Sequence, residues 1–286
     1  MVAETKRALV VEGGAMRGIF AAGVLDGFMR ENFKPFDFAI GVSAGSTNLI
    51  GYLTHDYQRS YRILTELAQA KEFIDPIRGL TGGHFCDVEW LWRESFNQID
   101  LHLERYLSGG VPLYVVTTRI SDGQAAYLQV DEQNLHELFP ASCAIPLVYR
   151  DFPEVEGEAM TDGGVADSIP VIRAYEQGAR EITVVLSRGI GYRKKIGRTL
   201  GITERLLGNY PALYSAIEKR AQLYNDALDF IANPPADCKV HVLAPPEYFP
   251  VGRFTRQLEK LEIGYNSGLR AGLDHVDAYR ENGASE

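Results

Sequence analysis

The hydrophobic positions of the first fifty residues alternate between short apolar runs and amphipathic stretches. Residues 8–12 form an apolar run that ends at Glu12, which is typical of a buried strand. Apolar residues then recur at three- to four-residue spacing over 18–31, which predicts a helix. A second apolar run at 36–42 and a second helical stretch at 44–52 follow. This repeated strand–helix order predicts a parallel sheet flanked by helices.

The rest of the chain continues this alternation with longer helical parts. Residues 56–107 are mostly helical by pattern, with a glycine-rich break at 79–83. β-Branched residues at 113–120 predict a strand, and 125–130 is its expected hairpin partner. The remaining predicted elements are a helix at 132–139, a strand at 158–161, a helix at 170–178, a strand at 182–186, a helical stretch at 199–232, a strand at 240–243 and a helix at 254–281.

A chain of 286 residues accommodates one large domain, or one domain with an appendage. The polar, basic segment 188–198 is the candidate boundary. We expect an α/β core over 7–190 and a mainly helical C-terminal region over 191–286. Because a strand and a helix return after residue 238, we expect that region to pack on the core.

Composition and charge narrow the classes of function. Apolar residues make up 45% and charged residues 23%, as in ordinary globular proteins, and the net charge is −9. An acidic chain has no general attraction to nucleic acid, so we expect no nucleic-acid partner. The start of the chain resembles a strand rather than a signal peptide, and the three cysteines form no CxxC pair. We therefore expect a cytoplasmic protein without a metal or other cofactor.

A Gly-x-Ser-x-Gly sequence, Gly41-Val42-Ser43-Ala44-Gly45, lies between a predicted strand and a predicted helix. A serine on such a sharp turn is held above the sheet with its hydroxyl exposed, and the glycines permit close packing. The N-terminus of the helix also supplies partial positive charge near a developing oxyanion. Chance is the alternative, because glycine and serine are common, but the position favours a nucleophile.

A glycine-rich loop, Gly13-Gly14-Ala15-Met16-Arg17-Gly18, follows the first strand. Its backbone N–H groups could bind phosphate or form an oxyanion hole. A tight structural turn is the alternative. The loop departs from G-x-G-x-x-G at Ala15 and lacks the Lys-Ser/Thr of a P-loop, which disfavours nucleotide binding.

A third glycine motif, Asp162-Gly163-Gly164, follows the strand predicted at 158–161. On its own, a hairpin turn is the simpler interpretation, because Asp-Gly is a common turn pair. A small-residue segment, Ala141-Ser142-Cys143-Ala144-Ile145-Pro146, precedes it.

Together these motifs resemble the patatin-like phospholipase family, in which a G-G-G-x-R/K-G loop, a G-x-S-x-G elbow and a D-G-G/A turn occur in this order. The segment 141–146 resembles the family's A-S-x-A-x-P segment. The resemblance covers about residues 7–190 and, more loosely, the last strand and helix, and it favours a bacterial cytosolic member. It implies a three-layer α/β/α sandwich with a mostly parallel central sheet and a helical C-terminal elaboration.

The resemblance also implies a catalytic Ser–Asp dyad, with Ser43 as nucleophile and Asp162 as general base. The backbone N–H groups of Gly13, Gly14 and Ala15 would form the oxyanion hole. Ala15 departs from the family's glycine and would carry a steric cost of roughly 1 kcal/mol or more at positive φ. The motif residues that would support the site without reacting are Arg17, Gly18, Gly41, Gly45, Gly163 and Gly164. Whether Arg17 touches substrate or braces the loop stays open.

The expected reaction is hydrolysis of lipid acyl esters, of phospholipase A or lysophospholipase type, through an acyl-enzyme. The expected partner is a lipid or small acyl ester, with transient contact at a membrane surface. The alternatives are a broad carboxylesterase or an acyltransferase using the same dyad, and a non-catalytic lipid-binding scaffold. Acceptor choice is a property of the pocket, which the sequence does not describe.

A Ser–acid–His triad would need a histidine after Asp162, and only His241 and His275 qualify. His241 alternates with valines in a strand, so it faces away from them. His275 lies near acidic residues of the last helix, which favours a solvated surface position. The triad is therefore the weaker hypothesis.

Two other segments admit more than one role. Residues 79–96 combine glycines with Trp90, Leu91 and Trp92, which suits a lid or acyl-chain wall, or a helix that docks on the core. A basic cluster could contact phosphate headgroups, or be a solvated loop; it comprises Arg188, Arg193, Lys194, Lys195 and Arg198.

Overall fold

The computed structural model describes residues 5–195 and 205–283. Its central sheet has the strand order β5-β6-β3-β2-β1-β7-β8, with β4 also paired to β3. The strands from β3 to β8 in this order are parallel, and β4, β5 and β6 form antiparallel pairs at one side. The strands are β1 (Lys6–Val11), β2 (Phe38–Val42), β3 (Leu113–Arg119), β4 (Ala125–Gln129), β5 (Glu154–Val155), β6 (Glu158–Asp162), β7 (Ala179–Val185) and β8 (Lys239–Leu243).

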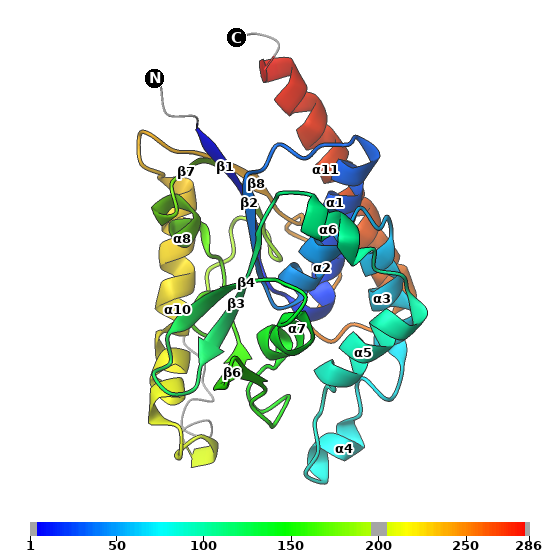
Figure 1. The fold of residues 1–286 in the computed structure, drawn as a ribbon, viewed down its shortest axis with the longest axis vertical. Helices are drawn as coiled ribbons and strands as arrows, with labels where there is room; N and C mark the ends of the chain where they lie inside the picture. The colour runs from blue at the N-terminus through cyan, green and yellow to red at the C-terminus, as the bar shows by residue number, and fades with distance from the viewer. Residues whose placement is uncertain (1–4, 196–204, 284–286) are drawn as a thin grey trace.

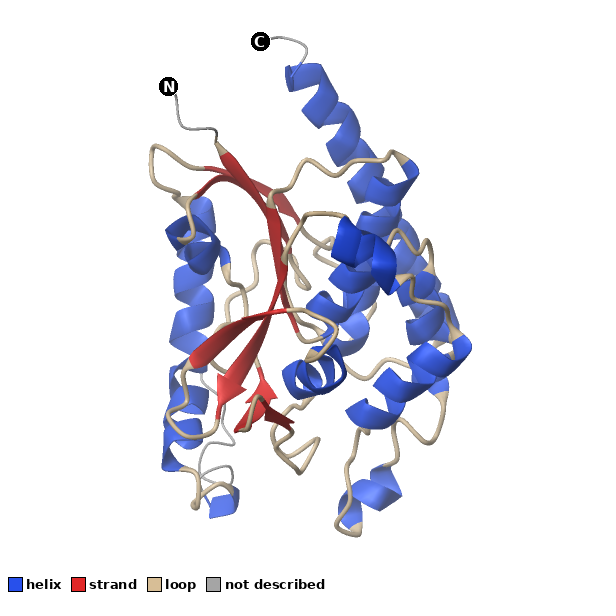
Figure 2. Ribbon diagram, viewed as in Figure 1, coloured by secondary structure: helices blue, strands red, loops and turns tan. Residues whose placement is uncertain are grey.

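Helices cover both faces of the sheet, which makes a three-layer α/β/α sandwich (Figures 1 and 2). One face carries α8 and α10, and the other carries α1, α2 and α11, with α3 to α7 beside them. The helices are α1 (Ile19–Arg30), α2 (Ala44–Leu53), α3 (Arg59–Thr65), α4 (Pro76–Leu80), α5 (Val88–Gln98), α6 (Leu103–Ser108), α7 (Leu135–Cys143), α8 (Val171–Glu176), α10 (Pro211–Ala232) and α11 (Leu258–Gly283), with 3₁₀ turns η1 (Ala15–Gly18) and η2 (Leu67–Gln69).

The central strand β1 shows why the sheet is buried on both faces. Leu9 and Val11 belong to the hydrophobic cluster under α1, α2 and α11. Ala8 and Val10 belong to the cluster under α8 and α10. Because successive side chains of a strand point to opposite faces, a continuous apolar run is what a strand between two helical layers requires.

The strands β2 and β6 both pair with the same edge of β3, β2 with its first part and β6 with its end. Val42, at the end of β2, is in register with Val116 of β3. Asp162, at the end of β6, is in register with Thr117, the next residue of β3. The antiparallel β6 therefore ends where the parallel β2 ends, and this brings Ser43 and Asp162 to one place.

Close packing of α1 on α11 joins the two ends of the chain (Figure 1). A Cβ atom at Gly23 would lie 2.1 Å from the carbonyl oxygen of Tyr265, and one at Gly268 would lie 2.0 Å from that of Phe20. Real Cβ atoms do not approach so closely, so these two helices meet backbone to backbone only because glycine occupies both positions.

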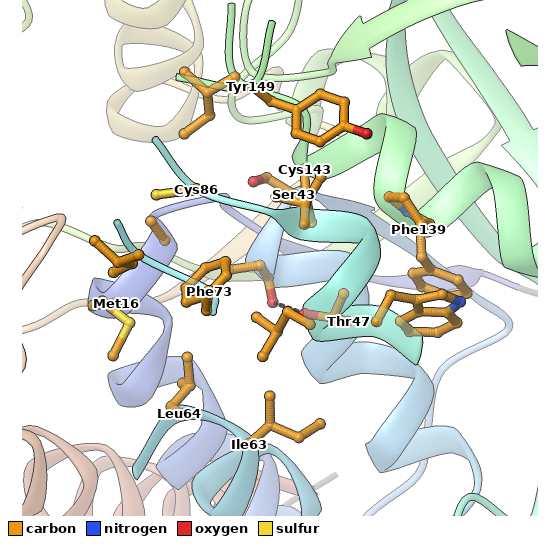
Figure 3. Close-up of a pocket in the computed structure, with 18 of the residues that line it drawn as sticks. Met16, Ser43, Thr47, Ile63, Leu64, Phe73, Cys86, Phe139, Cys143 and Tyr149 are labelled. Carbon is orange, nitrogen blue, oxygen red and sulfur yellow. Dashed lines mark hydrogen bonds between the residues drawn. The ribbon is translucent and has the colours of Figure 1, made fainter. Parts of the chain in front are cut away.

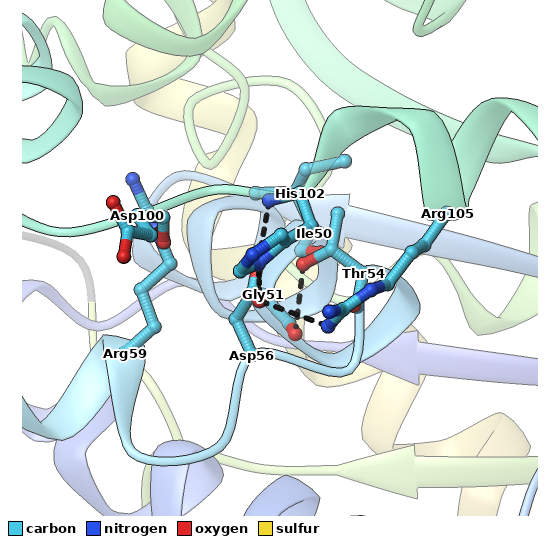
Figure 4. A network of polar contacts seen from close by, with 8 residues as sticks. All are labelled: Ile50, Gly51, Thr54, Asp56, Arg59, Asp100, His102 and Arg105. Atoms are coloured by element: carbon cyan, nitrogen blue, oxygen red, sulfur yellow. Dashed lines mark hydrogen bonds and ion pairs between the residues drawn. The ribbon is translucent and has the colours of Figure 1, made fainter.

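A polar network closes the C-terminal end of α2 against α6 (Figure 4). The Nδ1 atom of His102 lies 2.5 Å from the Asp56 carboxylate, whose other oxygen accepts the His102 backbone N–H at 2.9 Å. Arg105 donates to the carbonyl of Thr54 at 3.3 Å. His102 therefore braces a helix junction and lies outside the candidate site.

Two expectations about local structure are wrong. The helical stretch predicted over 199–232 is interrupted by a turn at 207–210, and α10 begins at Pro211, while residues 199–204 lie outside the described part. Proline suits the first position of a helix, so the break falls just before it. The Asp162 turn is not a hairpin, because no described strand pairs with β6 beyond it and the chain continues to α8.

Candidate active site

Ser43 occupies a strained turn between β2 and α2. Its backbone has φ 53° and ψ −129°, a conformation that is rare for a residue with a Cβ atom. A Cβ atom at Gly41 would lie 2.5 Å from Ser46 Cα, and one at Gly45 would lie 2.4 Å from the carbonyl oxygen of Val11. Both glycines of the motif are thus required for the chain to turn this tightly, as a nucleophile elbow demands.

Ser142 of α7 holds this turn from behind. Its hydroxyl accepts a hydrogen bond from the Ser43 backbone N–H at 2.9 Å and donates one to the Val116 carbonyl at 2.7 Å. Ser142 is fully buried, so it satisfies two groups that water cannot reach. The second residue of the segment 141–146 therefore fixes the elbow to β3.

The glycine-rich loop lies directly against Ser43. A Cβ atom at Gly13 would be 2.9 Å from Ser43 Cβ. The backbone N–H groups of Gly13, Gly14 and Ala15 donate no hydrogen bond to any acceptor among the described residues. Ala15 has φ 49°, so the steric cost expected for a non-glycine residue applies here. The loop presents unsatisfied donors beside the serine, as an oxyanion hole requires.

Asp162 is buried at the end of β6, and its side chain is fixed by the residues that follow it. The N–H of Gly164 donates to Asp162 Oδ1 at 2.7 Å, and Thr118 Oγ1 donates to the Asp162 carbonyl at 2.9 Å. A Cβ atom at Gly163 would lie 2.1 Å from the Val116 carbonyl oxygen, so only glycine fits there. The motif is needed for packing at the aspartate as well as for the turn.

The electrostatic surroundings of Asp162 favour a more basic carboxylate than usual. Burial raises the pKa of Asp162, and this effect exceeds the opposing ones from the charge of Arg220 and from hydrogen bonds with Ser43 and the Gly164 N–H. A higher pKa strengthens a carboxylate as a proton acceptor, provided that it is still ionised at the working pH.

An apolar cavity of about 100 Å³ opens at Ser43 (Figure 3). Figure 3 shows Ser43 beside Cys143, with Ile63 and Leu64 across the cavity. Burial raises the pKa of Cys143 to about 12, so this thiol is protonated at neutral pH and does not compete as a nucleophile. A cavity lined almost entirely by apolar groups beside the serine suits an acyl chain.

A second, polar cavity adjoins the first and is lined by Ser43, Asp162 and several cationic side chains. Arg17 is one of them, and its guanidinium also donates to the hydroxyl of Ser187 at 3.4 Å. Gly18 packs its backbone against Ala44, with a Cβ atom there 3.1 Å from that of Ala44. The glycine-rich loop thus contributes both open N–H groups and a buried cation.

The two triad histidines lie away from these cavities. No histidine occurs among the described residues that line either one. His241 Nε2 lies 2.9 Å from a carboxylate oxygen of Glu181. His275 is not the solvated surface residue expected: its ring packs at 5.6 Å from Phe28 and 5.7 Å from Phe33, and burial together with His241 lowers its pKa to about 4. The structure gives the triad hypothesis no support.

Residues of the segment 79–96 dock on the core and also form the wall of the apolar cavity. Trp92 is buried and stacks on Phe139 with ring centroids 4.5 Å apart. Leu91 and Trp92 both line the cavity. The same side chains therefore dock this segment on the core, as one alternative expected, and line the apolar cavity, as the acyl-chain wall would require.

The basic cluster divides into different environments. Arg188 and Lys194 line the polar cavity. Arg193 forms an exposed ion pair, and Lys195 is exposed. Arg198 lies outside the described residues. The segment is thus neither a uniform headgroup patch nor a simple solvated loop.

Three residues of the site could not be assigned from the sequence. The sequence indicates Ser142 only as part of a small-residue segment. Arg220 of α10 and Arg253, which precedes α11, both line the polar cavity. Helical periodicity identifies a buried stripe, but it does not indicate which basic residue of a helix faces a cavity.

Family models match most of the chain. Residues 9–175 match the model described as patatin-like phospholipase, and this match contains the elbow, the glycine-rich loop and the Asp162 turn. The chain belongs to the patatin-like phospholipase family. Residues 210–282 match a domain of unknown function, DUF6363, which includes α10, β8 and α11.

One curated relative of this patatin-like protein is the uncharacterized protein YjjU of Escherichia coli (strain K12). It is 34% identical over 247 residues, which cover 84% of this chain and 68% of the relative. Among solved structures, the crystal structure of VipD from Legionella pneumophila aligns with a TM-score of 0.44 at 11% identity, covering 96% of this chain and 67% of that chain.

Proposed function

We propose that this patatin-like protein is a serine acyl hydrolase that cleaves lipid acyl esters, of phospholipase A or lysophospholipase type, through an acyl-enzyme. Ser43 is the nucleophile, Asp162 the general base, and the N–H groups of Gly13, Gly14 and Ala15 form the oxyanion hole. The supporting observation is the register of β3, which brings Ser43 and Asp162 together beside the unsatisfied loop N–H groups.

Acylation begins when Ser43 Oγ attacks the acyl carbonyl carbon while its proton passes to the Asp162 carboxylate. The loop N–H groups stabilise the resulting oxyanion, by about 3–4 kcal/mol per donor in comparable sites. The tetrahedral intermediate collapses, and Asp162 returns the proton to the departing alcohol. Water then attacks the acyl-enzyme with Asp162 again as base, which releases the fatty acid and restores the Ser43 hydroxyl.

The apolar cavity supports the choice of lipid esters over small polar ones. It opens at Ser43 and is walled by Leu64, Phe73, Trp92 and Phe139. A fatty acyl chain placed there would bury its methylenes at about 0.8 kcal/mol each. A broad carboxylesterase or an acyltransferase would use the same dyad, and a non-catalytic scaffold would use the same cavity.

Hydrolysis of p-nitrophenyl butyrate by purified variants tests the dyad. We expect Ser43→Ala and Asp162→Asn each to lower kcat by at least about a thousandfold while circular dichroism is unchanged. Asp167→Asn is the matched control, because Asp167 is a half-buried, hydrogen-bonded aspartate near the same turn but lines neither cavity. Wild-type rates in either dyad variant would overturn the mechanism.

Two further measurements separate the alternatives. A fluorophosphonate probe should label wild-type protein and not Ser43→Ala; absence of labelling would favour the scaffold. Mass spectrometry of the products, with water and an added alcohol as competing acceptors, distinguishes hydrolysis from acyl transfer.

We also propose a cytoplasmic location with peripheral contact at membranes. None of the helices in the described ranges is both long and apolar enough to cross a bilayer. Exposed apolar side chains next to cavity-lining residues support peripheral contact: Leu80 is 87% exposed, Ile77 66%, Phe254 42% and Leu147 41%.

A further inference from the structure

The polar cavity beside Ser43 is rich in positive charge. It measures about 40 Å³, and its lining comes from the glycine-rich loop, the Asp162 turn, the segment after β7, α10 and the loop before α11. Five cations and two carboxylates face it: Arg17, Arg188, Lys194, Arg220 and Arg253, against Glu12 and Asp162. We call these five side chains the cationic cluster.

The carboxylates of the protein offset only part of the charge of this cationic cluster, since five cations face two carboxylates. Within the described ranges, none of its members forms an ion pair within 4.0 Å. Glu12 accepts hydrogen bonds from the Ser187 N–H at 2.6 Å and from the Tyr224 hydroxyl at 3.1 Å, and Arg188 and Lys194 each lie over a tyrosine ring at 4.2 Å. The excess of positive charge around the cavity favours an anionic ligand.

Individual members of the cationic cluster retain unused donors. The Nε atoms of Arg17 and Arg220 are buried, and neither has a hydrogen-bond partner. Burial and the charge of Arg220 lower the pKa of Lys194 to about 7, and burial together with Arg188 lowers that of Arg17 to about 10. A bound anion would supply acceptors for these donors and would raise both pKa values again.

The position of the cationic cluster identifies which part of a substrate it would contact. The apolar and polar cavities share the lining residues Ala15, Ser43, Ile145 and Arg253. An ester whose carbonyl carbon lies at Ser43 therefore has its acyl chain in the apolar cavity. Its alcohol portion then extends toward the cationic cluster.

We propose that the substrate is an acyl ester whose alcohol portion carries a phosphomonoester, and that the cationic cluster binds the phosphate dianion. This inference rests on the proposed function. Hydrolysis then gives a fatty acid and the phosphorylated alcohol, with one water consumed. A zwitterionic phosphodiester such as phosphocholine would place a cation among five others, so it is a poor substrate. The cluster also gives a role to the DUF6363 region, which contributes Arg220 and Arg253.

Competition between matched esters tests the substrate class. The probes are 1-decanoyl-glycerol 3-phosphate, 1-decanoyl-glycerol and 1-decanoyl-glycero-3-phosphocholine, each below its micelle concentration. We expect kcat/KM for the phosphomonoester to exceed that for each of the other two by at least tenfold. Equal values would overturn the proposal while leaving the Ser–Asp mechanism standing.

Lys194→Met removes one charge of the cationic cluster with little change of volume. We expect it to lower the ratio of kcat/KM for the phosphomonoester over the neutral ester by at least tenfold. Lys195→Met is the matched control, because Lys195 is the exposed neighbour and does not line the cavity; it should leave the ratio unchanged. A ratio unchanged in Lys194→Met and also in Arg188→Met would overturn the role of the cluster.

Calorimetric binding of glycerol 3-phosphate gives a readout that needs no catalysis, so it also separates failure of the dyad from failure of the cluster. At pH 8 we expect wild-type protein and Ser43→Ala to bind it with uptake of a proton, and Lys194→Met to take up less. Glycerol should not bind. Failure of glycerol 3-phosphate to bind would contradict the proposal. So would a combined result in which inorganic phosphate binds as tightly as glycerol 3-phosphate and the enzyme shows no preference for the phosphomonoester, because this would indicate a site for free phosphate.

Discussion

At the scale of single residues, Ser142 shows how one hydroxyl fixes several parts of the site. It ties the Ser43 turn to the carbonyl of Val116 in β3. The next residue of β3, Thr117, is the one that pairs with Asp162. The backbone at Ser43 is strained, so the conformation persists only while neighbouring contacts hold it. Ser142 is such a contact.

Removing that hydroxyl tests the link. Ser142→Ala leaves a buried N–H and a buried carbonyl without a partner, so we expect a loss of unfolding free energy of about 1–3 kcal/mol. We also expect a lower kcat for p-nitrophenyl butyrate. Denaturant unfolding and initial rates check both, with Thr54→Ala for comparison, because Thr54 is a buried hydroxyl bonded to the Ile50 carbonyl and lines neither cavity. A kcat equal to wild type would show that the elbow does not depend on Ser142.

The raised pKa of Asp162 predicts a pH dependence of activity. The proposed mechanism uses the ionised carboxylate of Asp162. The rate on a neutral ester should therefore fall as the pH falls through the pKa of Asp162, which lies above the ordinary value of 3.8. Arg220 favours the ionised carboxylate, so Arg220→Gln should move this acidic limb to higher pH. Rate–pH profiles of the two proteins check the direction; a shift to lower pH would contradict the assignment of Asp162.

At the scale of elements, the junction of α1 and α11 depends on glycines that place two backbones in contact. In an exposed helix position, Gly→Ala raises helix stability by up to about 1 kcal/mol. At Gly268 the added methyl group would meet the Phe20 carbonyl, so the sign should reverse.

We therefore expect Gly268→Ala to lower the free energy of unfolding by about 1–3 kcal/mol, as in other overpacked cores, and to lower the melting temperature accordingly. Asn266→Ala, at an exposed position of the same helix, is the control and should be neutral or slightly stabilising. Thermal unfolding by calorimetry compares them. Equal stability of the two variants would mean that the helices can separate at no cost.

The elements also show where prediction from sequence succeeds and where it stops. The strands at 8–12, 36–42 and 113–120 are confirmed, because apolar runs bounded by glycine loops have few other interpretations. The sequence also predicts the elbow and the Asp162 turn, because close backbone contacts at these places require glycine and so leave a recognisable motif. The cationic cluster was not found, because its members come from separate elements that only the fold brings together.

At the scale of the whole molecule, α4 lies at one end of the protein (Figure 1), and it carries two exposed apolar side chains. Ile77 and Leu80 belong to α4, and its chain neighbours Phe73 and Ile74 line the apolar cavity. The proposed peripheral contact therefore predicts that α4 faces the bilayer and that a membrane-bound substrate enters from this end.

Leu80→Asp tests this orientation. Because it places a charge where the bilayer would be, we expect hydrolysis of vesicle phospholipid to fall about tenfold and vesicle sedimentation to decrease. The rate on monomeric p-nitrophenyl butyrate should stay as in wild type. Leu206→Asp, at an exposed leucine outside α4, is the control. Unchanged activity on vesicles would exclude α4 as the contact.

The pairing of α1 with α11 has a consequence for dividing the chain into fragments. Because α11 covers α1 and the loop before α11 supplies Arg253, a fragment that stops before α11 lacks part of the core and part of the polar cavity's lining. The region that matches the patatin-like model, residues 9–175, therefore leaves α1 uncovered when it is expressed by itself.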